Sequence, residues 1–199
     1  MIILGLTGSI AMGKSTAASM LQHMGVPVHD SDAAVHQIYK SDPEFHKQMY
    51  DYFLEAYMPF KKTIDRKKLA EIIYNDPYKK YLLEKLLHPK VRQSQQKFIK
   101  KCQRLKQDIA VLDIPLLYET EANKRCDAVV VVTAPYHTQK ARVLARPGMT
   151  EEKFIKILNS QMPDSEKCAL ADFIVQSGLG RKRMFRELER VIQSFGKTA

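Results

Sequence analysis

The sequence predicts an α/β fold in which a doubly wound parallel sheet is interrupted by a helical insertion. Three observations lead to this prediction. Short, nearly continuous apolar runs alternate with helical patterns, as buried parallel strands joined by helices require. A glycine-rich segment separates the first apolar run from the first helical pattern. In the middle third of the chain, the apolar residues recur at helical spacing only.

The first strand is expected over Ile2–Thr7, a short apolar run rich in β-branched residues. A helix should follow from Lys14 to about His23, and a second strand over Gly25–His29. Asp30 is a suitable N-cap for the next helix, which we expect from Asp32 to Tyr39. The chain therefore begins strand, helix, strand, helix.

Helices alone are expected over residues 42–106. Asp65 precedes apolar residues at helical spacing, and Asp76-Pro77 supplies an N-cap and a first-turn proline. The segment carries many lysines and arginines, most of which should lie on solvated faces. We therefore predict a helical insertion here.

Three more strands are expected after the insertion, over Ile109–Asp113, Ala128–Val132 and, more weakly, Phe173–Val175. Helices are expected over 135–144, 151–161 and 181–195, with Pro147-Gly148 separating the first two. Residues 1–41 and 107–199 should thus form the sheet-containing core.

Composition limits the class of protein. A chain of 199 residues with 45% hydrophobic residues can bury one substantial core. Its three cysteines lie far apart, which suggests a reducing compartment, and no apolar run is long enough to span a bilayer. We expect a soluble, cytoplasmic protein that does not bind membranes. The net charge of +10 would suit nucleic acid, an acidic membrane or a small polyanion, and does not choose among them.

The segment from Gly8 to Ser15 matches the phosphate-binding pattern G-x-x-x-x-G-K-[ST], and it stands between a predicted strand and a predicted helix. Glycines let the backbone wrap around phosphate, so that successive N–H groups face the anion. Lys14 would reach the β- and γ-phosphates of ATP, and the Ser15 hydroxyl would ligate Mg²⁺. A glycine-rich turn with a chance lysine is the alternative. The residues expected to bind the nucleotide here are Gly8, Ala11, Met12, Gly13, Lys14, Ser15 and Thr16.

Asp30 and Asp32 follow the second strand, whose carboxyl end should lie at the same sheet edge as the phosphate loop. A hydroxyl that attacks a phosphoryl group needs a carboxylate to orient it and accept its proton. Because Asp30 directly precedes the helix, we assign it to capping, and Asp32 is the candidate base. The alternative for Asp32 is a favourable position in the first helical turn. His36, four residues later, could hydrogen-bond Asp32 or be structural.

Arg142 and Arg146 are spaced by four residues near the end of a predicted helix. Two guanidinium groups on one face can clamp a polyphosphate, and the Pro147-Gly148 break suits a lid over about 142–155. The alternative is a solvated basic face at a helix C-terminus. Spacing alone does not decide between them.

Over nearly its whole length the chain resembles bacterial dephospho-CoA kinases. The resemblance rests on Leu6-Thr7-Gly8, Asp30-x-Asp32-x-x-x-His36, Leu87-His88-Pro89, Asp113-Ile114-Pro115-Leu116-Leu117-Tyr118-Glu119, Gln139-x-x-Arg142-x-x-x-Arg146, Gln161-Met162-Pro163 and Ala171-Asp172-Phe173. It implies a P-loop kinase with a helical CoA-binding insertion and a lid. The expected reaction transfers the γ-phosphate of ATP to the ribose 3′-hydroxyl of dephospho-CoA, the last step of coenzyme A biosynthesis.

The resemblance also implies roles for individual residues. Lys14, Asp32 and Arg142 would be catalytic, with Arg142 contacting phosphate from the lid and Arg146 helping to bind ATP. The dephospho-CoA acceptor would contact Asp32, His88, Leu116, Leu117 and Tyr118. Two departures stand out: Ala11 replaces a usual glycine, and Gln176 and Ser177 stand where an asparagine usually precedes glycine near the adenine.

Two other functions remain open at this point. Another small-metabolite kinase of the same fold would be revealed by a panel of acceptors. A nucleic-acid-binding ATPase would show steeply salt-dependent binding, but no motif of basic and aromatic residues supports it, so no nucleic-acid partner is expected. A GTP switch is least favoured because the guanine-reading motif fails on spacing at Asn123–Asp127.

Overall fold

The computed structural model describes residues 1–61 and 63–196. Its backbone divides into two compact units. The first comprises Met1–His29 and the chain from Lys101 onward, and the second is Asp30–Lys100. The chain therefore leaves the first unit once and returns to it.

A five-stranded sheet forms the centre of the first unit. Its strand order is β2-β5-β1-β6-β7, and β1 pairs in parallel with both β5 and β6. β7 pairs in parallel with β6. The strands are β1 (Ile2–Thr7), β2 (Val28–Asp30), β5 (Ile109–Asp113), β6 (Ala128–Thr133) and β7 (Phe173–Gln176). The predicted α/β class and all five predicted strands are confirmed.

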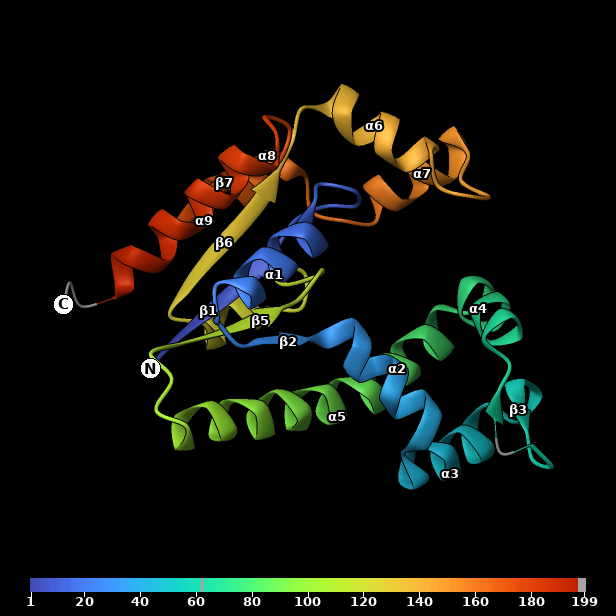
Figure 1. The fold of residues 1–199 in the computed structure, drawn as a ribbon. Helices are drawn as coiled ribbons and strands as arrows, with labels where there is room; N and C mark the ends of the chain where they lie inside the picture. The colour runs from blue at the N-terminus through green and yellow to red at the C-terminus, as the bar shows by residue number, and fades with distance from the viewer. Residues whose placement is uncertain (62, 197–199) are drawn as a thin grey trace. The chain divides into compact units, whose positions relative to one another are not determined.

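Both faces of this sheet are buried. On one face, Leu4 and Leu6 of β1 share a core with Met20 of α1 and Leu188 of α9, and Figure 1 shows both helices along the sheet. On the other face, Gly5 leaves room for Leu117, whose Cδ1 would lie 2.6 Å from a β-carbon at that position. The helices of this unit are α1 (Lys14–His23), α6 (Tyr136–Leu144), α7 (Glu151–Asn159), α8 (Asp164–Ala169) and α9 (Arg181–Phe195), with a 3₁₀ turn η2 (Ala122–Arg125).

The second unit is mostly helical, as predicted, around a core that includes Phe45, Met49 and Phe53. The short antiparallel hairpin β3–β4 was not predicted, because two-residue strands leave no periodic signal. The elements are α2 (Ser31–Ser41), α3 (Pro43–Tyr52), the 3₁₀ turn η1 (Leu54–Ala56), β3 (Tyr57–Met58), β4 (Thr63–Ile64), α4 (Arg66–Asn75) and α5 (Pro77–Arg104).

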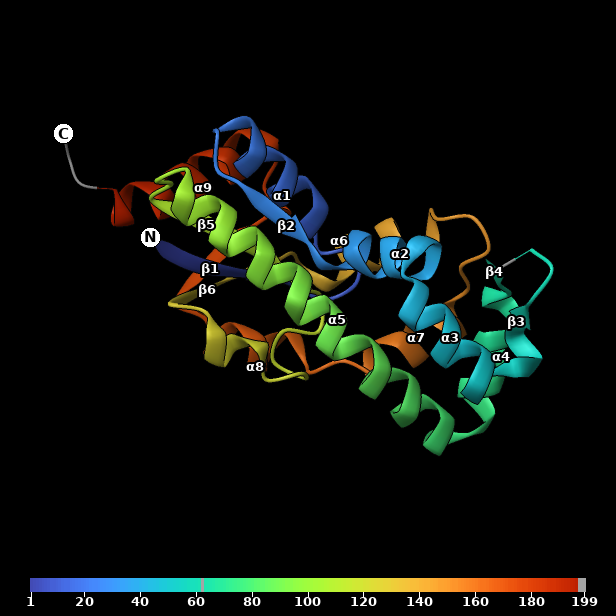
Figure 2. The same cartoon turned by 90° about the horizontal axis from the view of Figure 1, so that it is seen from below.

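Helix α5 remains continuous through Pro89, as Figure 2 shows. Proline has no N–H, so the Lys85 carbonyl loses its intrahelical donor at this point. His88, expected to help build this region, lies on α5 with an exposed side chain. From Lys101 the helix belongs to the first unit.

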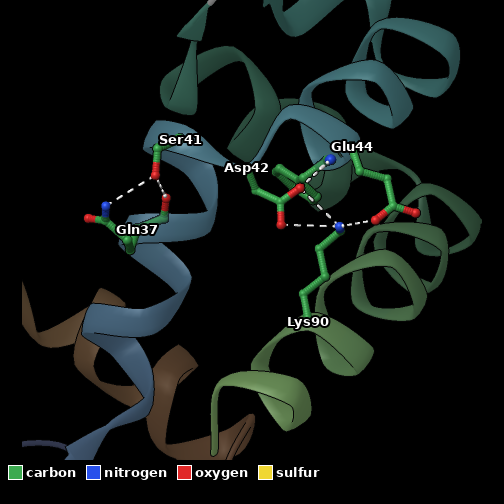
Figure 3. A network of polar contacts seen from close by, with 6 residues as sticks. Gln37, Ser41, Asp42, Glu44 and Lys90 are labelled. Carbon is green, nitrogen blue, oxygen red and sulfur yellow. Dashed lines mark hydrogen bonds and ion pairs between the residues drawn. The ribbon is translucent and has the colours of Figure 1, made fainter. Parts of the chain in front are cut away.

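A polar network ties α3 to α5 within the second unit (Figure 3). The Asp42 carboxylate caps α3 by accepting from the Phe45 N–H at 2.7 Å. Lys90 Nζ lies 3.0 Å from Asp42 Oδ1 and 2.8 Å from Glu44 Oε2. The cap and the ion pairs therefore share one carboxylate.

Candidate active site

The phosphate loop, Gly8–Ser15, connects β1 to α1, as the pattern predicted. Gly13 has φ 95° and Ala11 has φ 58°, so both lie in the left-handed region. Gly8 is required for a different reason, since a β-carbon there would lie 2.5 Å from the Val132 carbonyl oxygen. The loop thus tolerates the alanine at position 11, in a conformation that disfavours it.

Backbone donors at the start of α1 are available to an anion. Met12 N–H closes a turn onto the Ser9 carbonyl at 3.1 Å, and Ala17 N–H bonds the Gly13 carbonyl. Within the described part of the chain, the N–H groups of Gly13, Lys14 and Ser15 have no acceptor. A helix N-terminus with unpaired donors on a glycine-containing loop is a phosphate-binding arrangement.

Lys14 forms an ion pair beside the loop. Its Nζ lies 2.5 Å from Asp113 Oδ1, and the two side chains are 15% and 5% exposed. Asp113 ends β5, and Leu6 of the neighbouring strand β1 is its register partner. Sequence reasoning quoted Asp113 only as part of the family motif and gave it no role. Its position at the end of the strand next to β1 was the signal that would have identified it.

The other loop residues differ in exposure. Ser15 is exposed and Thr16 is half-buried at the start of α1. Met12 is buried, and its Sδ accepts from the Ala134 N–H at 3.2 Å. Met12 therefore offers a ligand its backbone and not its side chain.

Arg142 lies against the loop. Its Nη1 donates to Ser177 Oγ at 2.8 Å and to the Ala11 carbonyl at 3.4 Å, and its Nη2 donates to the Ser177 carbonyl at 2.9 Å. Ser177 Oγ in turn donates to the Met12 carbonyl at 2.5 Å. Among residues 1–61 and 63–196, the Nε–H and one Nη2–H of Arg142 have no acceptor, and these groups can donate to a ligand.

The spacing of Arg142 and Arg146 predicted that they share one helical face. In the structure only Arg142 lies in α6, whereas Arg146 lies beyond the end of this helix and is exposed. Helices α6 and α7 form a helical hairpin. They contact each other through stacked Tyr136 and Phe154 rings, whose centroids are 6.0 Å apart. A Lys140–Glu151 ion pair joins them as well.

Asp30, Asp32 and His36 belong to the second unit. The Asp30 carboxylate accepts from the Ala33 N–H at 2.9 Å, which confirms its capping role. Asp32 lies in the first turn of α2 and is exposed. His36 does not pair with Asp32, because its Nδ1 lies 2.9 Å from Arg66 Nη1 and so accepts from that guanidinium.

The three residues expected near an acceptor differ in exposure. Leu116 is 40% exposed, whereas Leu117 is fully buried and Tyr118 is 8% exposed. Burial raises the pKa of Tyr118 to about 12, with Asp172 adding to the effect. Tyr118 is therefore a neutral hydroxyl near pH 7.

Glu119 anchors the segment that follows α7. It lies 2.8 Å from the fully buried Lys167 and accepts from the Met162 N–H at 2.9 Å. Burial alone would raise the pKa of Glu119, but the hydrogen bonds from Lys167 and Met162 lower the pKa below its usual value. Glu119 is thus charged at neutral pH.

Known proteins of one family are similar to this chain. The family model described as dephospho-CoA kinase matches residues 2–180. Two curated relatives named dephospho-CoA kinase are those of Mesorhizobium japonicum, 47% identical over 96% of this chain and 95% of the relative, and Agrobacterium fabrum, 43% identical over 98% and 99%.

Solved structures are similar as well. A crystal structure from Thermus thermophilus has a TM-score of 0.85 at 30% identity and covers 97% of this chain and 96% of its own. The dephospho-CoA kinase from Campylobacter jejuni has a TM-score of 0.72 at 28% identity, covering 98% of this chain and 97% of its own.

Proposed function

This chain belongs to the dephospho-CoA kinase family, and we propose that it transfers the γ-phosphoryl group of ATP to the ribose 3′-hydroxyl of dephospho-CoA. The products are ADP and CoA. The observation that carries the proposal is the phosphate loop with unpaired N–H groups at Gly13, Lys14 and Ser15. The preceding step must supply a dinucleotide-like thiol with a free 3′-hydroxyl.

The phosphate loop binds ATP through its backbone and Lys14. The N–H groups at the start of α1 bond the phosphate oxygens, and Lys14 moves from Asp113 to the β- and γ-phosphates. Thr16 and the backbone of Ala11 and Met12 complete the binding loop, with Gly8 allowing its close approach to β6. These contacts stabilise the charge that spreads over the transferred group in the transition state.

The oxygen donors beside the loop suit Mg²⁺. The Ser15 hydroxyl and the buried Asp113 carboxylate would hold the ion, directly or through water. In residues 1–61 and 63–196 no cluster of three or more His, Cys, Asp or Glu side chains could hold a metal. Bound Mg²⁺ would neutralise part of the negative charge on the phosphates.

Asp32 orients the acceptor hydroxyl and accepts its proton. It is an exposed carboxylate in the first turn of α2, and its neighbour Asp30 already fills the capping role. A loose transition state asks for positioning more than for a strong base, which an ordinary carboxylate can provide.

The remaining assignments extend the proposal to the acceptor and the lid. Leu116 has the exposure needed to contact dephospho-CoA, whereas Leu117 and Tyr118 would act by supporting the backbone beside it. The exposed His88 would bind the acceptor from the 42–106 insertion. Residues 142–155 form the lid, in which Arg142 contacts phosphate through its remaining N–H groups and Arg146 adds a second cation.

A cytoplasmic location is part of the proposal. The three cysteines are unpaired, as a reducing compartment favours. In the described part of the chain, no helix has the length and apolar character to cross a membrane.

An acceptor panel tests the function. The protein is incubated with ATP, Mg²⁺ and dephospho-CoA, shikimate, a sugar acid, or duplex DNA, and ADP release is followed. Dephospho-CoA alone should stimulate turnover, with CoA as the product identified by mass spectrometry. Stimulation by a different acceptor, or by DNA, would overturn the proposal.

A further inference from the structure

The peptide groups on both sides of Ile10, in the phosphate loop, are bonded by two glutamine side chains. Gln161 Oε1 accepts from the Ile10 N–H at 3.1 Å, and Gln139 Nε2 donates to the Ile10 carbonyl at 2.9 Å. Gln139 is 3% exposed, so its amide has little access to water. Isoleucine at this position thus contributes its backbone to a clamp formed by two amides.

The two glutamines lie near the two ends of the α6–α7 hairpin, one at the start of α6 and one after α7. Gln139 is in the first turns of α6, and Gln161 follows the end of α7 by two residues. The Gln161 segment is itself fixed, because Glu119 accepts from the adjacent Met162 N–H and is paired with the buried Lys167. The two ends of the α6–α7 hairpin are therefore bonded to the same residue of the phosphate loop, Ile10.

The clamp is part of a larger arrangement of the loop backbone. The carbonyls of Ile10, Ala11 and Met12 accept, in that order, from Gln139, Arg142 and Ser177. In a trans peptide the carbonyl and the following N–H point in opposite directions. Holding the Ile10 and Met12 carbonyls outward therefore aims the N–H groups of Ala11 and Gly13 the other way, into the loop.

The backbone conformation of Ala11 explains why the loop needs these two bonds. Its φ of 58° is unfavourable for a residue with a β-carbon. Bonds on both peptide groups of Ile10 restrict the backbone directly before it. The free loop is thereby kept in the conformation that phosphate requires, before any nucleotide binds.

From these contacts we infer that Gln139 and Gln161 are positioning residues that hold the phosphate loop, through Ile10, in its anion-binding conformation. The inference concerns ATP binding and rests on the proposed function only in the identity of the nucleotide. Both glutamines act through the backbone of Ile10. Their effect should appear in nucleotide affinity and should be absent from affinity for the acceptor.

The first experiment replaces each glutamine by methionine, which has similar length and no hydrogen-bonding amide, with the exposed Gln103 as a matched control. ADP binding is measured by calorimetry on the full chain at 25 °C. Loss of one neutral hydrogen bond should raise the Kd for ADP and the KM for ATP roughly three- to tenfold. The KM for dephospho-CoA should stay within about twofold, and Gln103→Met should change nothing.

The second experiment uses glutamate, which accepts hydrogen bonds but cannot donate them. Gln161→Glu keeps an acceptor for the Ile10 N–H, whereas Gln139→Glu loses the donor and faces a carbonyl. Each change adds one negative charge beside the same peptide, so repulsion of ADP is common to both. Gln139→Glu should therefore lose at least roughly threefold more ADP affinity than Gln161→Glu.

Several outcomes would overturn the inference. They are equal affinities for the two glutamate variants, unchanged ADP affinity in both methionine variants, and a fall in thermal stability with no change in ADP binding. If the buried Gln139→Met variant does not fold, the half-buried Gln161→Met decides the matter. Failure of the wild-type chain to phosphorylate dephospho-CoA would remove the proposed function and leave the ADP measurements valid.

Discussion

Lys14 Nζ lies 2.5 Å from Asp113 Oδ1, so the loop lysine and the carboxylate that ends β5 neutralise each other in the structure. Both are largely buried, with 15% and 5% of their side chains exposed. In the proposed reaction, ATP binding exchanges this pair for contacts of Lys14 with phosphate. The pair thus compensates the charge of a buried carboxylate.

Lys14→Ala should lower kcat/KM roughly 10²- to 10³-fold, because one preorganised donor to the developing phosphate charge is removed. Steady-state kinetics with varied ATP would measure the change, and circular dichroism would check folding. Lys124, which pairs with Glu121 on the surface, is a matched control, and Lys124→Ala should leave turnover unchanged. Near wild-type turnover of the Lys14 variant would refute its assignment.

Asp113→Asn should weaken metal use. The amide keeps the size of the side chain but removes the charge that faces Lys14 and that we propose to hold Mg²⁺, so the Mg²⁺ concentration for half-maximal activity should rise roughly 10- to 100-fold. The measurement is a Mg²⁺ titration at saturating ATP, after removal of metal by chelation. An unchanged midpoint of the Mg²⁺ titration would show that Asp113 pairs with Lys14 and takes no part in metal binding.

Asp32→Asn should lower kcat about 10²- to 10⁴-fold with little change in ATP affinity, because the acceptor hydroxyl loses its base. Asp30→Asn is the matched control: asparagine is an equally good N-cap, so the bond to the Ala33 N–H persists. Kinetics and ADP calorimetry on both variants separate the roles. A larger loss of turnover in Asp30→Asn would reverse the assignment.

The Lys90 network should stabilise the protein only in a defined pH range. Burial alone would raise the pKa of Asp42, but the Phe45 N–H and Lys90 lower the pKa overall. Burial alone would lower the pKa of Lys90, but Glu44 and Asp42 raise the pKa overall. The contribution of Asp42 is therefore present above its usual pKa of about 3.9 and lost as pH falls, and that of Lys90 is present below about 10.4 and lost as pH rises.

Lys90→Met should accordingly lower the free energy of unfolding by about 1 kcal/mol at pH 7, since the pairs are partly exposed. The difference between wild type and variant should be smaller at pH 3, which lies below the usual pKa of an aspartate, because protonation of Asp42 removes its ion pair as the pH falls. Urea unfolding at the two pH values measures it. Asp42→Asn should retain the cap but lose the ion pair, and a pH-independent difference would contradict the electrostatic explanation.

Ala11→Gly should raise the free energy of unfolding by about 1 kcal/mol, because the left-handed conformation disfavours a β-carbon. Ala18→Gly, in the interior of α1, should do the opposite by a similar amount, because glycine is a poor helix residue. Urea unfolding of both variants measures whether each substitution raises or lowers the free energy of unfolding. Destabilisation by both would show that Ala11 makes contacts worth more than its strain.

Most of the sheet could be predicted from the sequence because a buried parallel strand is a nearly continuous apolar run. The strands at Ile2–Thr7 and Ile109–Asp113 and the helix at Lys14–His23 have the predicted bounds. The helix expected over 151–161 ends at Asn159, and α8 was not predicted, since six residues give too little periodicity. Local patterns thus define the long elements and miss the short ones.

The residues of the candidate site also fall into two groups: those that a local motif predicts and those that it does not. The phosphate loop is a local motif and was found directly, whereas Asp113, Gln139 and Gln161 contact it across long sequence separations. A partner 151 positions away leaves no spacing signal at either end. For His36 the sequence left open a bond to Asp32 or a structural role, and in the structure its Nδ1 accepts from Arg66 of α4, 30 positions away.

The position of β1 in the centre of the sheet has a consequence for synthesis on the ribosome. Ile2 pairs with Ile109 and Leu4 with Ala128, so both edges of the first strand wait for roughly a hundred residues to be made. At about 5–20 residues per second that interval is on the order of 5–20 s. The second unit, Asp30–Lys100, is contiguous and can complete its own core during it. Strand β1, an apolar strand without neighbours during that interval, therefore depends on a chaperone or on transient contacts until β5 and β6 are made.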